Sequence, residues 1–95
     1  MRVEPVEIYS DTTNAVVMRH PSRRFPGLLI QGDTLHGMCQ RADRACSSAR
    51  AVLDEEAYLE LNDLRNQLWA GLNHYKAVLT QHGISLPFNE APSSS

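Results

Sequence analysis

The feature that most constrains the fold is a change of hydrophobic period at Leu35. Before Leu35, short runs of apolar and β-branched residues are separated by polar or proline-containing segments, a pattern typical of strands. From Leu35 to His82, apolar residues recur every three or four positions and no proline interrupts them, which is typical of amphipathic helices. The order of the two patterns predicts strands first and helices afterwards.

Three strands are predicted before the change of period. Residues 3–9 form the first, and Pro5 suits an edge strand or a strand start because proline cannot donate to a ladder. A polar turn at residues 10–14 joins this strand to residues 15–19 as a hairpin. The segment HPSRRFPG then stops any regular element, and residues 28–31 form a short, buried third strand that ends at Gly32.

The first predicted helix spans residues 35–53 and buries mostly small side chains. Its apolar stripe consists of Leu35, Met38, Cys39, Ala42, Ala45, Cys46, Ala49 and Leu53. Gly37 in the first turn costs roughly 1 kcal/mol relative to alanine. We therefore expect either that a neighbour packs tightly against Gly37 or that the helix begins later.

The second predicted helix spans residues 54–82. Asp54 is expected to cap its start, and Gly83 is expected to end it in a Schellman motif with Ile84 against Leu79. Its buried stripe consists of Ala57, Leu61, Leu64, Leu68, Leu72, Tyr75 and Leu79. One continuous helix over residues 35–82 is the alternative, but it would be about 70 Å long, more than so small a domain can cover.

The predicted fold class is α+β, in the order β-β-β-α-α. A small three-stranded antiparallel sheet is expected to carry two antiparallel helices packed on one face. Residues 1–88 are predicted to form a single α+β domain. Residues 89–95, of sequence NEAPSSS, are predicted to be a disordered C-terminal tail because they have nothing to bury.

Charge and composition exclude several classes of function. The net charge of −2 and the pI of about 6.0 argue against nucleic acid as a partner, because such proteins present a basic face. No apolar run is long enough for a membrane span, and the start of the chain has no apolar signal core, so we expect a cytoplasmic protein. Two cysteines about 10 Å apart along one helix are expected to be free thiols, because a disulfide needs less than about 7 Å.

The densest positive charge lies just before the third strand. Arg19, His20, Arg23 and Arg24 lead into Phe25, and the arginine fork suits a phosphate, a carboxylate or an acidic partner. The alternative is a solvated loop whose arginines neutralise the acidic start of the second helix. We predict a partner-binding loop, because loops on rigid scaffolds carry function disproportionately.

Other candidate sites give weaker signals. Gly32, Asp33 and Thr34 open a helix and could bind an anion through backbone N–H groups, although a plain helix cap explains the same residues. No metal and no cofactor are expected, because His36 and Cys39 match no compact ligand spacing. No complete set of acid, base and nucleophile can be named, so we do not expect an enzyme.

A second candidate binding residue is Trp69 on the second helix. It lies along one edge of the buried stripe with Tyr58, Arg65 and Lys76. Arg65 precedes Trp69 by four residues, which permits cation–π stacking. Tryptophan, tyrosine and arginine are enriched in interface hot spots, whereas the alternative is a tryptophan at the edge of the core.

The segment FPGLLIQGDTL, with alanines following it in the helix, resembles a segment of HicB-type antitoxins. The matching positions are Phe25, Pro26, Gly27, Gln31, Gly32, Asp33, Thr34, Leu35, Ala42, Ala45 and Ala49. With the preceding hairpin, the resemblance covers residues 3–50. The stretches YSDTTNA and RRFPG with IQGD also resemble a group of small bacterial proteins without an assigned function.

This resemblance implies a bacterial, non-catalytic protein that neutralises a partner protein, as an antitoxin or an immunity protein does. Arg23, Arg24 and Phe25 would dock the partner, with Trp69 as a second anchor. The alternative is a module that holds an anionic metabolite between the arginine loop and Asp33, and a small hydrolase ranks below both. Self-association through an edge strand or the second helix stays open.

Overall fold

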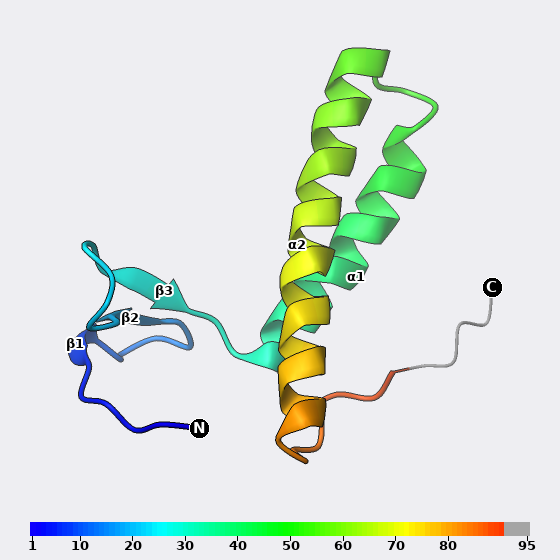
Figure 1. The fold of residues 1–95 in the computed structure, drawn as a ribbon. Coiled ribbons are helices and arrows are strands. Elements are labelled where there is room, and N and C mark those ends of the chain that lie inside the picture. The colour runs from blue at the N-terminus through cyan, green and yellow to red at the C-terminus, as the bar shows by residue number, and fades with distance from the viewer. Residues whose placement is uncertain (91–95) are drawn as a thin grey trace. The chain divides into compact units, whose positions relative to one another are not determined.

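The computed structural model describes residues 1–90, so most of the predicted tail at 89–95 lies outside the described residues. Five elements follow one another along the chain (Figure 1): β1 (Glu7–Ser10), β2 (Val16–Arg19), β3 (Gly27–Leu29), α1 (Gly32–Ala49) and α2 (Glu55–Gln81). The elements form two compact units, residues 1–31 and the residues from Gly32 onward. We call them the sheet unit and the helical unit.

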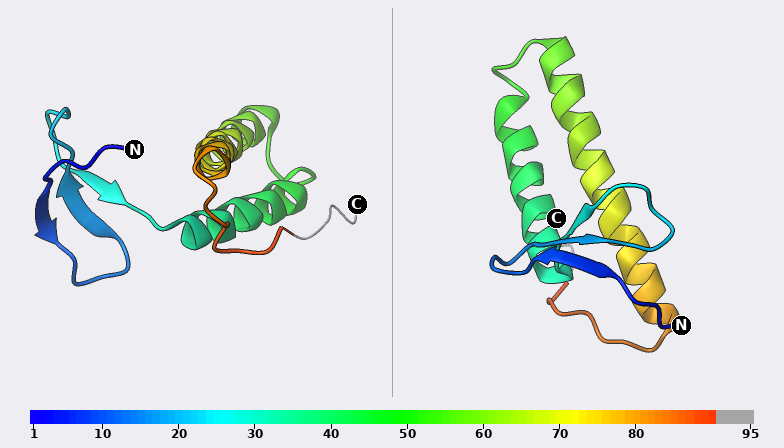
Figure 2. Two further views of the ribbon diagram at one scale, coloured as in Figure 1. Left: turned by 60° about the horizontal axis from the view of Figure 1, so that its bottom comes forward. Right: turned by 90° about the vertical axis from the view of Figure 1, so that its left-hand side faces the viewer.

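The sheet unit is a three-stranded antiparallel sheet in the order β1-β2-β3 (Figure 2). Ile8 lies opposite Met18, whereas Ser10 lies opposite Val17, so a bulge interrupts β1 at Tyr9. β3 pairs with β2 without interruption over its three residues. This arrangement confirms the predicted hairpin and the third strand beside it.

Two details of the sheet differ from the prediction. The first strand begins at Glu7, because residues 3–6 form no ladder and Pro5 has no N–H to donate. The third strand is exposed instead of buried, and 59% of Leu28 and 51% of Leu29 is accessible to solvent. β3 is an edge strand, so one side of its backbone has no neighbouring strand within the sheet.

Helix α1 begins at Gly32, three residues before the predicted start. Gly32 is buried against Tyr75 of α2, and a Cβ atom at Gly32 would lie 2.3 Å from the Tyr75 ring. Gly32 therefore permits a close approach of the two helices. At Gly37 the prediction was either a tightly packed neighbour or a later helix start. A Cβ atom at Gly37 would meet nothing within 4 Å, and the helix begins earlier, so both alternatives are wrong.

Both predicted ends of α2 are confirmed by hydrogen bonds. The Asp54 carboxylate accepts from the Ala57 N–H group at 2.8 Å, as an N-cap does. At the other end, the Ile84 N–H donates to the Leu79 carbonyl at 2.9 Å, and Gly83 has a φ of 66°. This is a Schellman motif, in which glycine adopts the left-handed conformation at little cost.

Replacing Asp54 with alanine should lower the free energy of unfolding by about 1 kcal/mol, because the first turn of α2 loses its side-chain acceptor. Asp54→Asn keeps an acceptor oxygen and should stay close to wild type. Urea unfolding followed by circular dichroism measures both variants. Equal losses in the two variants would show that the negative charge of Asp54, and not its acceptor oxygen, stabilises α2.

The two helices run antiparallel and pack against each other (Figure 1). Their buried centre consists of Cys39, Cys46 and Leu72, and both cysteines are free as predicted. Burial raises the pKa of the Cys39 thiol, and the negative charge of Asp43 raises it further. Cys39 therefore behaves as a small apolar residue at neutral pH.

Most residues of the two predicted stripes are buried or half-buried, and three are not. Ala45, Leu53 and Leu64 belong to the predicted stripes but are exposed. After α2, the chain returns to the start of α1, where the Phe88 ring stacks on His36 with ring centres 4.2 Å apart. Lys76 pairs with Glu90 in the same segment. Residues 88–90 therefore contact both helices.

The fold class is confirmed as α+β, with a three-stranded antiparallel sheet followed by two helices that pack on each other. The packing of these helices on a face of the sheet stays a prediction, as does the single domain. None of the helices in residues 1–90 is long and apolar enough to span a membrane.

Candidate functional site

The arginine loop between β2 and β3 is shaped by a hydrogen-bonded turn. The Arg23 N–H group donates to the His20 carbonyl at 2.9 Å, and Pro21 occupies the second position of the turn, which its fixed φ favours. The Ser22 N–H also donates to Nδ1 of His20 at 3.0 Å. These contacts lie within the sheet unit and fix the loop next to the sheet.

Arg19 is engaged inside the sheet unit. Its guanidinium pairs with Glu7, the residue opposite it in the register of β1 and β2. The hydrogen bond from Arg19, together with its charge, holds the pKa of the Glu7 carboxyl below its usual value. A second N–H group of Arg19 donates to the Arg23 carbonyl at 2.8 Å. Arg19 therefore supports the loop, and its predicted contact with a partner stays a prediction.

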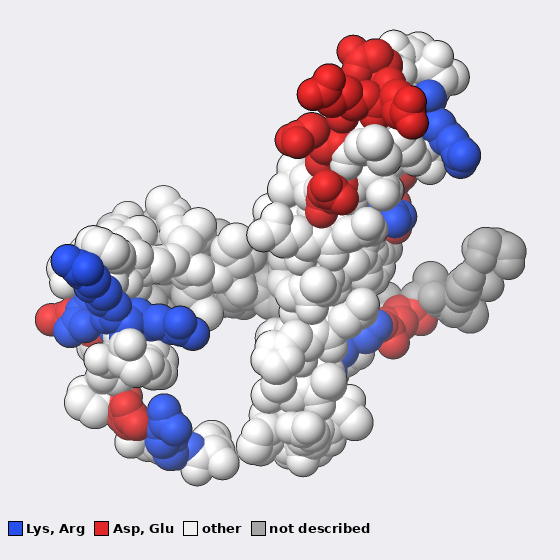
Figure 3. Space-filling model, turned by 45° about the horizontal axis from the view of Figure 1, so that its top comes forward, with Lys and Arg blue, Asp and Glu red and all other residues white. Residues whose placement is uncertain are grey.

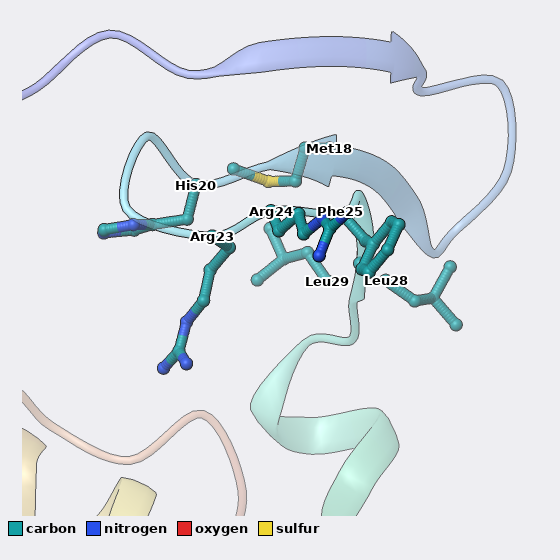
Figure 4. A pocket seen from close by; sticks show the side chains of 8 residues that line it. Met18, His20, Arg23, Arg24, Phe25, Leu28 and Leu29 are labelled. Carbon is teal, nitrogen blue, oxygen red and sulfur yellow. The ribbon is translucent and has the colours of Figure 1, made fainter.

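The loop and β3 form one groove with a volume of about 570 Å³ (Figure 4). We call it the arginine-rimmed groove; its lining residues are Met18, His20, Arg23, Arg24, Phe25, Gly27, Leu28 and Leu29. Its size falls within the range of about 300–1,000 Å³ that is usual for small-molecule sites. The apolar lining comes from both strands and from Phe25, of which 70% is exposed.

The groove depends on the register between β2 and β3. Met18 lies opposite Gly27, and cross-strand partners point to the same face of a sheet. Because Gly27 has no side chain, the space next to Met18 stays open, and a Cβ atom at Gly27 would meet nothing within 4 Å. A larger residue at position 27 would cover Met18, so the hollow depends on the glycine at this position.

The rim of the groove has unpaired positive charge. Among residues 1–90, no carboxylate forms an ion pair with Arg23 or Arg24. The Arg24 guanidinium lies 5.3 Å from the centre of the Phe25 ring, and the Arg23 side chain extends outward from the loop (Figure 4). Two cationic groups next to an exposed apolar surface can bind a ligand that combines carboxylates with apolar side chains.

At the start of α1, which was predicted as a possible anion site, Gly32 and Asp33 already contact other residues of the helical unit. Gly32 is buried against Tyr75. The Thr34 N–H group donates to the Asp33 carboxylate at 2.8 Å, which places a negative charge beside the first turn of α1. Packing against Tyr75 accounts for Gly32, and the local hydrogen bond accounts for Asp33. Anion binding at Gly32, Asp33 and Thr34 stays a prediction.

Trp69 lies in the helical unit, where it joins the two helices. Its indole N–H donates to the Asp43 carboxylate of α1 at 2.9 Å. Arg65 donates to the same oxygen at 3.3 Å. The two side chains predicted to stack on each other are thus joined through a shared acceptor. This contact within the helical unit is sufficient to explain why Trp69 is half-buried. Its role as a partner anchor stays a prediction.

The structure brings His20, Arg23, Arg24 and Phe25 together in one groove. Sequence reasoning missed Leu28 and Leu29 as lining residues, because it assigned the third strand to the core. It missed Met18 because it predicted no register between the second and third strands. It also missed Asp43 as the acceptor that joins the two helices. The available signal was a polar residue at the edge of an apolar helix stripe. A register prediction that set Gly27 against Met18 would have located the groove.

Charged groups are distributed unevenly on the molecule (Figure 3). Acidic side chains gather at one end of the helical unit, where α2 begins with Glu55 and Glu56. Negative charge at this end favours the positive end of the helix dipole. Within the described part of the chain, no three histidine, cysteine, aspartate or glutamate residues are grouped so that they could hold a metal ion.

The fold and the groove together define a small α+β protein whose three-stranded antiparallel sheet carries an open, cationic groove and is followed by a helical pair. The chain belongs to a protein family of unknown function, DUF6959, whose model matches residues 1–88. No significant match to the chain was found among curated proteins or solved structures.

Proposed function

We propose that the chain is a non-catalytic interaction protein that binds a partner protein through the arginine-rimmed groove. The observation that supports this proposal is the meeting of unpaired Arg23 and Arg24 with exposed apolar side chains in one hollow. Exposed apolar surface rimmed by polar groups is typical of interaction sites. The groove favours a protein segment over a small anionic metabolite, because its apolar side chains are exposed, whereas small-molecule sites enclose most of their ligand.

The narrower version of this proposal is a bacterial, cytoplasmic neutralising protein of the antitoxin or immunity kind. It is supported by the resemblance of residues 3–50 to HicB-type antitoxins described above. Such a protein acts by occupying a surface of its target, so it needs a binding groove and no catalytic residues. A target that becomes toxic to cells when this chain is absent would support this version.

The test begins with affinity purification of the chain from its source organism and identification of the bound protein by mass spectrometry. The identified protein is then expressed, and its dissociation constant is measured by calorimetry. Arg23→Glu with Arg24→Glu should weaken binding at least about 100-fold, because like charges would then face the acidic partner. Arg41→Glu with Arg44→Glu is the matched control, since these exposed arginines lie on α1.

Two outcomes would contradict the proposal. Equal affinities for wild type and the Arg23/Arg24 variant would remove the groove from the interface. A metabolite that raises the melting temperature of the wild type, but not of that variant, would assign the groove to a small ligand, because binding to the native state stabilises it by mass action.

A further inference from the structure

The two edges of the sheet are not equally available for pairing with another strand. The edge at β1 is interrupted by the bulge at Tyr9, and Pro5 lies just before the strand. Natural proteins use bulges and prolines at sheet edges to block pairing with another strand. The edge at β3 has no bulge, and all three of its residues are exposed. β3 is therefore the edge on which an additional strand can form a regular ladder.

The arginine-rimmed groove lies directly beside this edge. Gly27, Leu28 and Leu29 make up the whole of β3, and all three line the groove. Side chains on one face of a strand are about 7 Å apart, twice the rise per residue. A strand paired with β3 would thus direct alternate side chains toward the apolar lining, while its backbone bonds to the free edge.

The charge on the rim defines the chemistry of the added strand. Arg23 and Arg24 precede β3, and within residues 1–90 neither of them has a carboxylate partner. Arginine forms strong, bidentate hydrogen bonds with carboxylates. A segment that follows the edge can meet both arginines with acidic side chains and fill the groove with apolar ones.

We propose that the partner contributes an extended acidic segment, which adds to the free edge of β3 as a fourth strand and places alternate apolar side chains in the groove. The inference rests on the proposed function and specifies the form of the partner. Strand addition is a recurrent mode of peptide recognition, in which backbone bonds give affinity and pockets for alternate side chains give specificity.

Synthetic peptides of about ten residues, the length of a long strand, test the proposal with isotope-labelled protein and nuclear magnetic resonance. One peptide alternates glutamate with valine and phenylalanine, a second has lysine for glutamate, and a third is the acidic peptide with consecutive N-methylated amides. The acidic peptide should shift the amide signals of Gly27, Leu28 and Leu29 and slow their hydrogen exchange. The other two should bind at least about tenfold more weakly, because the lysine peptide is repelled by Arg23 and Arg24 and the N-methylated peptide cannot form a ladder.

A variant of the groove gives an independent readout. Gly27→Leu adds a side chain where the free protein has open space, and Gly27 does not have a positive φ, so the fold should tolerate it. The acidic peptide should bind at least about tenfold more weakly to this variant. Gly71→Leu is the matched control, since Gly71 is exposed on α2 and also has open space around it.

Several results would overturn the proposal. Binding of the N-methylated peptide as tightly as its parent would exclude strand addition while leaving the groove as a binding site, so the proposed function would stand. Equal binding of the lysine peptide would remove the charge argument, and no binding of the acidic peptide would remove the proposal itself. Concentration-dependent protection of residues 27–29 without peptide would assign the edge to a second copy of the chain.

Discussion

Leu72→Ala is expected to lower the free energy of unfolding by about 2–5 kcal/mol, the largest effect of any single truncation in the helical unit. Leu72 has no accessible surface and is the largest fully buried side chain in residues 1–90. Its removal leaves a cavity between α1 and α2, and the apolar surface around it loses contacts that the backbone cannot restore. A small domain has about 5–15 kcal/mol of stability in total, so this loss is large.

Urea unfolding followed by the fluorescence of Trp69, the single tryptophan of the chain, measures the effect of Leu72→Ala. Leu64→Ala is the matched control, because it makes the same chemical change on the same helix at a side chain that is 53% exposed. The control should lose no more than about 0.5 kcal/mol. Similar losses in the two variants would mean that α2 presents a different face to α1.

Asp43→Ala is expected to lower the free energy of unfolding by about 1–3 kcal/mol, because two donors on α2 then lose their shared acceptor. Most of this loss should come from the Trp69 indole N–H, which is held at 2.9 Å in a part-buried position. The ion pair with Arg65 should add little, since 34% of the Arg65 side chain and 41% of Asp43 is exposed and water screens such pairs.

Two further variants separate these contributions. Asp43→Asn keeps an oxygen that can accept from Trp69, so it should lose less stability than Asp43→Ala. Asp63→Ala removes an exposed carboxylate of α2 and should leave stability within about 0.5 kcal/mol of wild type. If Asp43→Ala also stayed within that margin, Asp43 would not join the two helices. The fluorescence of Trp69 should shift only in the Asp43 variants.

Features that depend on neighbouring residues could be predicted from the sequence. The cap at Asp54 and the helix end at Gly83 each involve only residues that are close in the sequence, so the residue types there were sufficient to predict them. The hairpin was predictable for the same reason, since a polar turn joins two short runs of strand-forming residues. The residues of the arginine loop were also predicted to lie together, because they are close in the sequence.

Features that depend on distant residues were predicted less well. Gly32 looked like the end of a strand, and its role became clear from the Tyr75 ring that lies against it, 43 positions away. The groove likewise depends on Met18 lying opposite Gly27, and neither residue alone suggests a hollow. The apolar run of β3 suggested burial, because hydropathy does not distinguish a core strand from an exposed edge.

The exposed edge of β3 has a consequence for how much of this protein a cell should make. An uncovered apolar strand pairs with any compatible strand, including those of unfolded chains, and so promotes aggregation. Under the proposed strand addition, molecules without the partner keep this edge open, whereas the partner covers it in the others. Synthesis of the two proteins in matched amounts would therefore protect solubility, and overproduction of this chain alone should yield more insoluble material than co-production.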